Sequence, residues 1–118
     1  MAAVTRPRLA TFTANGATRY GAVTDSGIVD LSARFGQSFP TLREVIANGA
    51  LMKLADEAAG RSPDVALDAV TWQPPIPAPE KIICIGVNYP DRNAEYKDGK
   101  DAPPYPSMFM RTPRSFVG

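Results

Sequence analysis

The sequence contains no histidine. The commonest general base and the commonest zinc ligand are therefore missing from these 118 residues. A Ser-His-Asp or Cys-His catalytic site cannot be built from them alone. The single cysteine, Cys84, excludes an internal disulfide, and its place inside an apolar run favours an inert buried thiol over a nucleophile.

Long hydrophobic runs and a charge of one sign are also absent. No stretch approaches the roughly 20 apolar residues that span a bilayer, and the N-terminus lacks the apolar core of a signal peptide. The 13 Lys and Arg residues are interspersed with 12 Asp and Glu residues, so no basic stripe points to nucleic acid. The composition predicts a soluble, cytoplasmic globular protein with neither a nucleic-acid nor a membrane partner.

What the first part of the chain does contain is an alternation of strand and turn signals. Residues 8–14 predict a strand, Asn15-Gly16 is a strong hairpin signal, and residues 18–24 predict the return strand. After a further turn, residues 28–31 predict a third short strand. The pattern indicates an antiparallel meander.

Two helices are expected to follow the meander. Thr41 and Glu44 have the spacing of a capping box, which predicts that a helix begins at this point. A second helix is predicted at about residues 50–59, with Gly60 as its C-terminal cap. The apolar stripes of both helices are assigned to the core and carry no chemistry.

Proline divides the chain into two parts. Nine of its 12 prolines lie from Pro74 onward, and the Pro-rich residues 74–80 predict a stiff connector. We therefore predict a small N-terminal α+β domain at residues 1–73, with an antiparallel sheet and two helices, and a second domain at residues 81–118. A short strand at residues 70–72 is expected to close the first domain.

The second part begins with the most apolar run of the chain, residues 82–87. A short run of this kind, rich in β-branched residues, predicts a strand buried on both faces. The chain then turns polar at Asn88. Such a strand can hold the residues of a site on a rigid support, although a core strand followed by a solvated loop is the alternative.

The second domain is expected to be incomplete. Residues 90–106 form a long polar stretch of the kind found in lids, binding loops or disordered segments, and residues 107–111 alternate like a strand. Fewer than about 40 residues without a disulfide rarely bury enough surface to fold alone. A strand buried on both faces also needs covering layers. Either the chain is truncated or another polypeptide completes it.

Residues 81–95 and 106–118 resemble the fumarylacetoacetate hydrolase (FAH) family. The family pattern is an apolar strand, Gly-x-Asn-Tyr, a His and a Glu three apart, a Phe-x-Lys strand, and then Pro, Ser and Gly. The corresponding residues here are Gly86-Val87-Asn88-Tyr89, Arg92 and Glu95, Phe109-Met110-Arg111, and Pro113 to Gly118. The N-terminal part also resembles the small N-terminal domain of that family, which leads through a Pro-rich connector into the main domain.

The resemblance implies that a mixed, β-rich catalytic domain starts in this chain. It implies an enzyme acting on 2-oxo or 1,3-dicarbonyl acids by C–C bond hydrolysis, decarboxylation, hydration or isomerisation through an enolate-like intermediate. It further implies a homodimer and a divalent cation, usually Mg²⁺, or Mn²⁺ or Ca²⁺. The family's metal ligands, a Glu-x-Glu pair and a later Asp, have no counterpart here, so we expect the 118 residues alone to be inactive.

Carried over residue by residue, the resemblance implies three catalytic candidates. Glu95 falls on the family's dyad glutamate. Arg92 stands where many members have histidine, and a guanidinium is a poor base, so it could bind a substrate carboxylate or position the lid instead. Arg111 falls on the family's lysine and keeps its positive charge. The implied substrate-binding candidates are Asn88, Tyr89 and Ser115.

Two kinds of alternative stand beside this interpretation. Arg92 and Glu95 could form an ordinary surface pair worth under about 1 kcal/mol. For the whole protein, the alternative is a non-catalytic binding or assembly subunit that retains the FAH scaffold. A third possibility is a divergent isomerase or decarboxylase in which water or another acid is the base.

Overall fold

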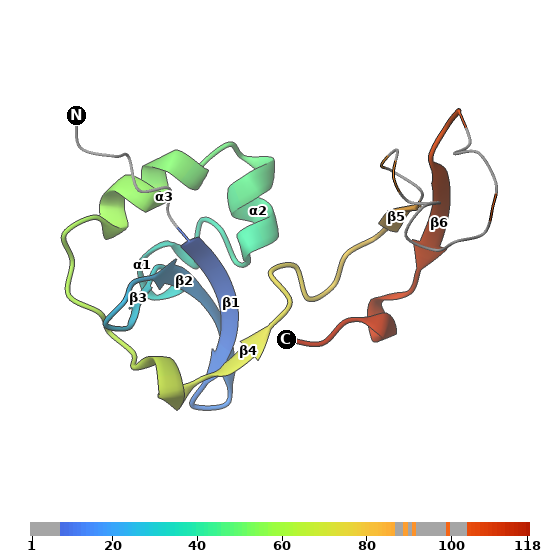
Figure 1. The fold of residues 1–118 in the computed structure, drawn as a ribbon. Coiled ribbons are helices and arrows are strands. Elements are labelled where there is room, and N and C mark those ends of the chain that lie inside the picture. Colours follow the sequence, from blue (N-terminus) through green and yellow to red (C-terminus); the bar gives the residue numbers. More distant parts are fainter. Residues whose placement is uncertain (1–7, 87–88, 90, 92–98, 100–103) are drawn as a thin grey trace. The chain divides into compact units, whose positions relative to one another are not determined.

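A computed structural model of the chain describes residues 8–86, 89, 91, 99 and 104–118. The chain divides into two compact units, residues 1–77 with 117–118, and residues 78–116. The predicted α+β class is confirmed, because antiparallel strands are combined with a few short helices (Figure 1). Within the described residues, no helix has both the length and the apolar character needed to cross a bilayer.

The first unit is built on a four-stranded antiparallel sheet. Its strands lie in the order β3-β2-β1-β4 and comprise β1 (Arg8–Ala14), β2 (Ala17–Val23), β3 (Ile28–Asp30) and β4 (Thr71–Gln73) (Figure 1). At the β1–β2 turn, Asn15 and Gly16 have φ values of 50° and 74°, which a tight hairpin turn requires. The predicted meander and the short strand before the connector are thus confirmed.

Three short helices lie between β3 and β4: α1 (Ser32–Phe35), α2 (Leu42–Ala47) and α3 (Leu51–Ala58). The capping box of α2 is confirmed, since the Arg43 N–H donates to Thr41 Oγ1 at 3.2 Å and the Thr41 N–H donates to a Glu44 carboxylate oxygen at 3.0 Å. Helix α1 was not predicted from the sequence, because four residues are too few for a periodic apolar pattern. Turns of 3₁₀ helix occur at Leu67–Ala69 and Pro113–Ser115.

The core of the first unit lies between the sheet and helices α2 and α3. It contains Tyr20, Ala22, Val29, Leu31, Leu42, Val45, Ala50, Leu54 and Ala58. A smaller cluster of Phe12, Ala14 and Ile28 packs against Val65 and Val70. Since side chains alternate along a strand, Phe12 and Ala14 leave one face of β1 while Leu9 packs against the larger cluster from the other. Both faces of the sheet are therefore covered.

The beginning of the Pro-rich connector is attached to the first unit. The Thr11 hydroxyl donates a hydrogen bond of 2.7 Å to the Pro75 carbonyl, and Ile76 packs against the larger core cluster. Residues 74–77 accordingly belong to the first compact unit. The assignment of residues 81–118 to the start of a catalytic domain stays a prediction.

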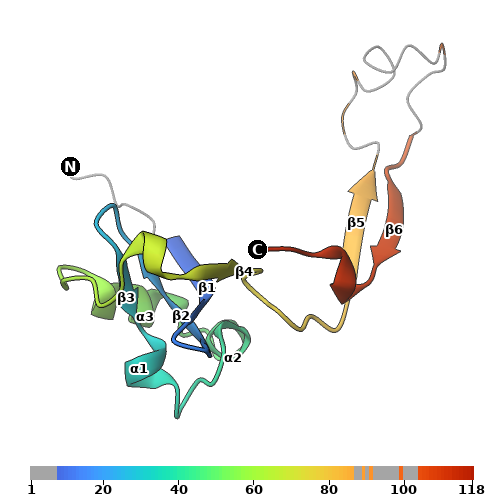
Figure 2. The same ribbon diagram turned by 90° about the horizontal axis from the view of Figure 1, so that it is seen from below.

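The second unit contains a two-stranded antiparallel ribbon, β5 (Ile82–Gly86) and β6 (Ser107–Arg111), whose strands lie side by side (Figure 2). The prediction that this apolar strand is buried on both faces is wrong for this chain. Ile83 and Ile85 are 58% and 48% exposed, and Cys84 is half-buried. The physical reason is that β5 pairs with β6 alone, and nothing among the described residues forms a second layer over it.

Candidate functional site

The six candidate residues divide into two groups. Asn88, Arg92 and Glu95 lie outside the described residues. Tyr89, Arg111 and Ser115 are described, and their positions are given below.

Arg111 is the last residue of β6 and pairs in register with Ile82 of β5. Its guanidinium carbon lies 5.4 Å from the centroid of the Phe109 ring, which is within the range of a cation–π contact. Arg111 and Phe109 are two positions apart in the strand, so both side chains leave the same face. The contact lies at the surface, since the Arg111 side chain is exposed.

The register places Ile82, Cys84, Gly86 and Ser107 on that face as well. Gly86 pairs with Ser107, and Cys84 pairs with Phe109. A Cβ atom at Gly86 would lie 3.0 Å from Ser107 Oγ and 3.6 Å from Phe109 Cε1, which is tighter than usual at the hydroxyl. Glycine at this position therefore leaves room for the Ser107 hydroxyl beside the aromatic ring. We call this surface the Arg111 face.

The Arg111 face offers one permanent positive charge beside an aromatic ring and a hydroxyl group. A guanidinium can bind a carboxylate or stabilise an oxyanion, but it cannot remove a proton at neutral pH because it is already protonated. Phe109 was not predicted as a site residue. The alternation of residues 107–111 is the signal that could have placed it beside Arg111.

The positions of Ser115 and Tyr89 say little about substrate binding. Ser115 ends the 3₁₀ turn Pro113–Ser115, where its hydroxyl lies 3.5 Å from Thr112 Oγ1 and its N–H donates to the Thr112 carbonyl at 3.0 Å. Tyr89 is about half exposed. Their substrate-binding role stays a prediction.

A divalent cation does not fit the part of the chain that the structure describes. Within it, no group of three or more Asp, Glu, His or Cys residues could hold a metal ion. A hard cation such as Mg²⁺ takes oxygen ligands and is normally held by at least one or two carboxylates. The described residues therefore do not make a site for a divalent cation by themselves.

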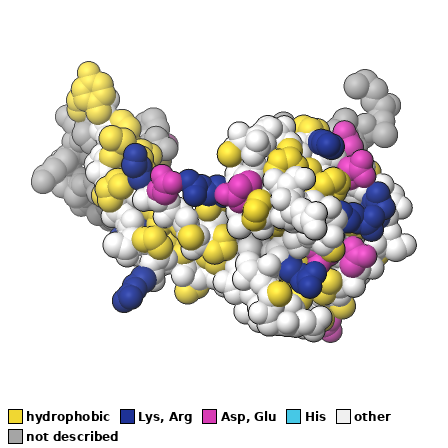
Figure 3. All heavy atoms as spheres, turned by 180° about the vertical axis from the view of Figure 1, so that it is seen from behind, with side chains coloured by type: hydrophobic (Ala, Val, Ile, Leu, Met, Phe, Trp, Pro, Cys, Tyr) yellow, Lys and Arg dark blue, Asp and Glu magenta, His cyan; other side chains and the backbone are white. Residues whose placement is uncertain are grey.

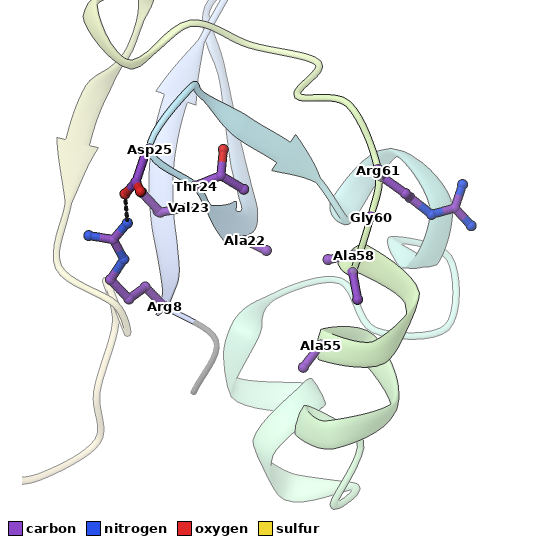
Figure 4. Close-up of a pocket in the computed structure, with 10 residues that line it drawn as sticks. Arg8, Ala22, Val23, Thr24, Asp25, Ala55, Ala58, Gly60 and Arg61 are labelled. Atoms are coloured by element: carbon purple, nitrogen blue, oxygen red, sulfur yellow. Dashed lines mark hydrogen bonds and ion pairs between the residues drawn. The ribbon is translucent and has the colours of Figure 1, made fainter. Parts of the chain in front are cut away.

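The first unit contains a cavity of about 370 Å³ between the end of β2 and helix α3 (Figure 4). Its floor is formed by small side chains such as Ala22 and Ala55, and two arginines lie at its rim. Arg8 is directed at Asp25 and pairs with it at 2.9 Å, and Arg61 points away from the floor (Figure 4). Because the charged groups do not converge on the cavity, it lacks the polar arrangement of a ligand site.

Asp30 is a buried carboxylate of the first unit, and its hydrogen bonds give it a structural role. Its carboxylate accepts hydrogen bonds from Arg19 Nη1 at 2.7 Å, Ser32 Oγ at 2.6 Å and the Ala33 N–H at 3.0 Å. Burial raises the pKa of Asp30, but the hydrogen bonds from Ser32, Arg19 and Ala33 outweigh it and hold the pKa below the ordinary value of 3.8. A carboxylate engaged in this way is a poor proton acceptor.

Comparison with solved structures adds evidence on the fold. The crystal structure of "a putative HpcE protein from Mycobacterium smegmatis" superimposes with a TM-score of 0.68 and 26% sequence identity, over 94% of this chain and 38% of that chain. HpcE is an enzyme of the FAH family. The present chain has an FAH-like fold. No family model matches it, and no curated protein does.

The FAH-like fold covers most of both units, since 94% of the chain takes part in the match. The chain spans only 38% of the length of the HpcE chain, so most of that protein has no equivalent here. The Arg111 face therefore belongs to a region that resembles part of an enzyme, and the activity of a whole enzyme is a matter for proposal.

Proposed function

We propose that this chain is the N-terminal portion of a metal-dependent enzyme of the FAH family that acts on 2-oxo or 1,3-dicarbonyl acids. The observation that carries the proposal is the likeness to the HpcE structure, at 26% identity over 94% of the chain. The reactions open to such an enzyme are C–C bond hydrolysis, decarboxylation, hydration and isomerisation through an enolate-like intermediate. A homodimer is part of the same proposal.

In this proposal, Arg111 supplies the positive charge of the site. A 2-oxo acid carries a carboxylate and develops further negative charge on its 2-oxo oxygen as an enolate forms. A cation that is already oriented stabilises such charge without reorganising during the reaction. Phe109 supports this role, because its ring lies within cation–π distance of the guanidinium.

Arg111 cannot be the base, so the proposal assigns proton transfer to another group. Glu95 is that group, and Arg92 is assigned to the substrate carboxylate. Asn88, Tyr89 and Ser115 are assigned to the wall of the substrate pocket. The ligands of the divalent cation are assigned to residues outside this chain.

The first experiment compares the 118-residue chain with the longest natural form of the protein. Each is purified and assayed with acylpyruvates and added Mg²⁺, following loss of the substrate enol absorbance. We expect no turnover by the 118 residues and clear turnover by the longer form. Turnover by the short chain would show that the metal ligands are not missing, and no turnover by the longer form would count against the enzyme.

Variants of the longest form then test the residues. Glu95→Gln should lower kcat strongly and leave Mg²⁺ affinity nearly unchanged, because it removes a base and no metal ligand. Arg111→Met should lower kcat/KM by about tenfold to hundredfold through loss of a charge-assisted contact, with partial recovery in Arg111→Lys. Arg114→Met, which removes a nearby exposed arginine, is the matched control. An equal effect at Arg114 would remove Arg111 from the site.

A non-catalytic binding or assembly subunit is the second candidate. It is favoured by Arg92, which stands where the resemblance implies histidine. Such a subunit would bind oxalate or pyruvate without turning over any acylpyruvate. Binding without turnover in the longest form, together with a stable complex with another chain, would decide for the subunit.

A further inference from the structure

Arg111 lies at one end of the β5–β6 ribbon, and the connection between the two strands starts from the other end. Arg111 pairs with Ile82, whereas Gly86 pairs with Ser107 where the chain leaves β5 and returns to β6. Glu95 belongs to that connection. Because a strand rises about 3.3 Å per residue, the Cα atoms of Arg111 and Ser107 lie roughly 13 Å apart. The Arg111 side chain therefore has to extend along the strand to bring its charge toward the connection.

The Phe109 ring is directed toward the same end. Cys84 is the direct partner of Phe109, so Gly86 is only its diagonal neighbour, and diagonal neighbours stand roughly 7–8 Å apart. A Cβ atom at Gly86 would nevertheless lie 3.6 Å from Phe109 Cε1, which shows that the ring extends toward Gly86. The Arg111 guanidinium carbon lies 5.4 Å from the ring centroid. The Arg111 side chain thus extends along the strand toward the ring.

Exposure alone does not distinguish Phe109. Its ring is 46% exposed, and hydrophobic side chains reach the surface in both units (Figure 3). What distinguishes the ring is its place between a glycine of β5 and an arginine of β6. Because the attraction between a cation and an aromatic ring acts at the ring face, it gives the guanidinium a preferred position. An aliphatic side chain at 109 would not supply this attraction.

Gly86 is explained by space and not by backbone conformation. It is not among the glycines with a positive φ, so residues with a side chain can adopt its backbone conformation. Glycine in a strand often marks a place where another group approaches closely. Here the approaching groups are the Phe109 ring and the Ser107 hydroxyl. A branched side chain at 86 would fill the space in which the ring lies.

We propose that Gly86 and Phe109 are positioning residues for Arg111. Gly86 leaves the space that the ring occupies, and the ring directs the guanidinium toward the connection between β5 and β6. Neither residue contacts the substrate in this inference. It rests on the proposed function, since it assigns an orientation to the positive charge of the same site.

The first test measures the contact in the 118-residue chain by NMR, without an assay of activity. Isotope-labelled arginine is incorporated, and the Arg111 signals are assigned by their loss in Arg111→Lys. Protons over the face of an aromatic ring are shifted upfield, so we expect upfield-shifted Arg111 side-chain signals in the parent chain. The shift should disappear in Phe109→Leu and persist in Phe109→Tyr, which keeps the ring.

Phe116→Leu is the matched control, because it removes a phenylalanine ring of similar exposure, 49%, from the same half of the chain. It should leave the Arg111 signals unchanged. The inference is overturned if the parent chain shows no upfield shift, or if Phe116→Leu abolishes it as fully as Phe109→Leu does.

The same signals test Gly86. Gly86→Val should reduce the shift as Phe109→Leu does, because its γ carbons would occupy the place of the ring. Gly86→Ala should keep most of the shift, since its Cβ alone would be at an ordinary contact distance from the ring. Backbone amide signals of β5 and β6 show whether the ribbon is intact. An intact ribbon with an unchanged Arg111 shift in Gly86→Val would contradict the role of Gly86.

The second test uses the longest natural form with Mg²⁺ and an acylpyruvate. Phe109→Leu should lower kcat by about threefold to tenfold with a smaller effect on KM, and Phe109→Tyr should restore most of the loss. In the Arg111→Met background, Phe109→Leu should have no further effect, because the ring acts only through the guanidinium. An equal loss in both backgrounds would show a merely structural role for Phe109 and reject the inference.

The two tests separate this inference from the proposed function. An Arg111 shift that depends on Phe109 and Gly86, without turnover by the longest form, would support the orientation and reject the enzyme. Turnover that depends on Arg111 but not on Phe109 would support the enzyme and reject the orientation.

Discussion

At the scale of single residues, Asp30 joins three segments of the first unit. Its carboxylate accepts hydrogen bonds from Arg19 of β2 and from Ser32 and Ala33 of α1, and its own N–H donates to the Asp64 carboxylate at 2.8 Å. No buried side-chain N or O atom among the described residues lacks a hydrogen-bond partner. Removing one member of such a network leaves the others unsatisfied, which is costly in a buried position.

We expect Asp30→Ala to lower the free energy of unfolding of the first unit by about 2–3 kcal/mol, because a buried acceptor of three hydrogen bonds is lost. Asp25→Ala is the matched control. Asp25 pairs with Arg8 on the surface, and such pairs contribute at most about 1 kcal/mol. Urea unfolding followed by Trp72 fluorescence measures both. Equal losses for the two variants would contradict the structural role of Asp30.

The same carboxylate makes stability depend on pH. Its pKa in the folded chain is below 3.8, so the unfolded state takes up the proton first as the pH falls. The stabilisation is therefore complete above pH 3.8 and is lost as the pH falls through the lower pKa of the folded state. We expect the parent chain to be more stable than Asp30→Asn at about pH 6, with the difference shrinking toward about pH 3. A difference that is constant with pH would contradict this.

Glu44 does not disturb that comparison. The Thr41 hydroxyl lowers the pKa of Glu44 through a side-chain hydrogen bond, so its ionisation also favours the folded state above its ordinary value of 4.5. Because Glu44 is present in both proteins, its contribution cancels when the parent chain is compared with Asp30→Asn.

At the scale of elements, a helix of six residues depends on its cap. Helix α2 (Leu42–Ala47) is too short to be stable in water, where isolated helices need roughly 12–15 residues. Thr41 and Glu44 satisfy its first N–H groups, and Leu42 and Val45 place it on the core. The start of α2 is thus determined locally and its stability comes from packing.

Replacing Thr41 should show how much the cap contributes. Thr41→Ala removes the hydroxyl that accepts from the Arg43 N–H, and we expect a loss of about 1 kcal/mol in the free energy of unfolding. Thr41→Ser keeps the hydroxyl and should lose less than half of that. Urea denaturation measures both, and a Ser variant as unstable as the Ala variant would assign the effect to the methyl group.

At the scale of the whole molecule, the two units differ in how they are stabilised. The first has a sheet covered on both faces, with Phe12, Ile28 and Leu54 completely buried. The second has a ribbon in which β6 is exposed throughout. We therefore expect the second unit to open at a lower free energy than the first.

The single tryptophan and the single cysteine report on one unit each, with Trp72 in β4 and Cys84 in β5. We expect Cys84 to react with a disulfide reagent in native buffer at a rate within about tenfold of that in the unfolded chain, while Trp72 fluorescence is still native. A Cys84→Ser variant gives the background. A labelling rate that rises only with the Trp72 transition would show that the two units unfold together.

Much of the first unit could be predicted because its signals are local. Asn15-Gly16 forces a hairpin, the spacing of Thr41 and Glu44 starts a helix, and alternation identifies the strands. Helix α1 escaped prediction because four residues are too few to show a periodic apolar pattern. The sequence predicted the candidate site as a motif, and three of its residues lie outside the described part of the chain. The contact between Phe109 and Arg111 was not predicted, because a motif does not state which side chains touch.

The hairpin, the strands of the first unit and the start of α2 thus follow from short-range sequence patterns. Burial does not follow from them, because it depends on which layers are present. The apolar residues 82–87 predict a core strand, yet the structure leaves Ile83 and Ile85 exposed because, among the described residues, β5 pairs only with β6. Apolar side chains favour burial against other apolar groups. Only the tertiary structure shows whether a second layer that could bury them is present.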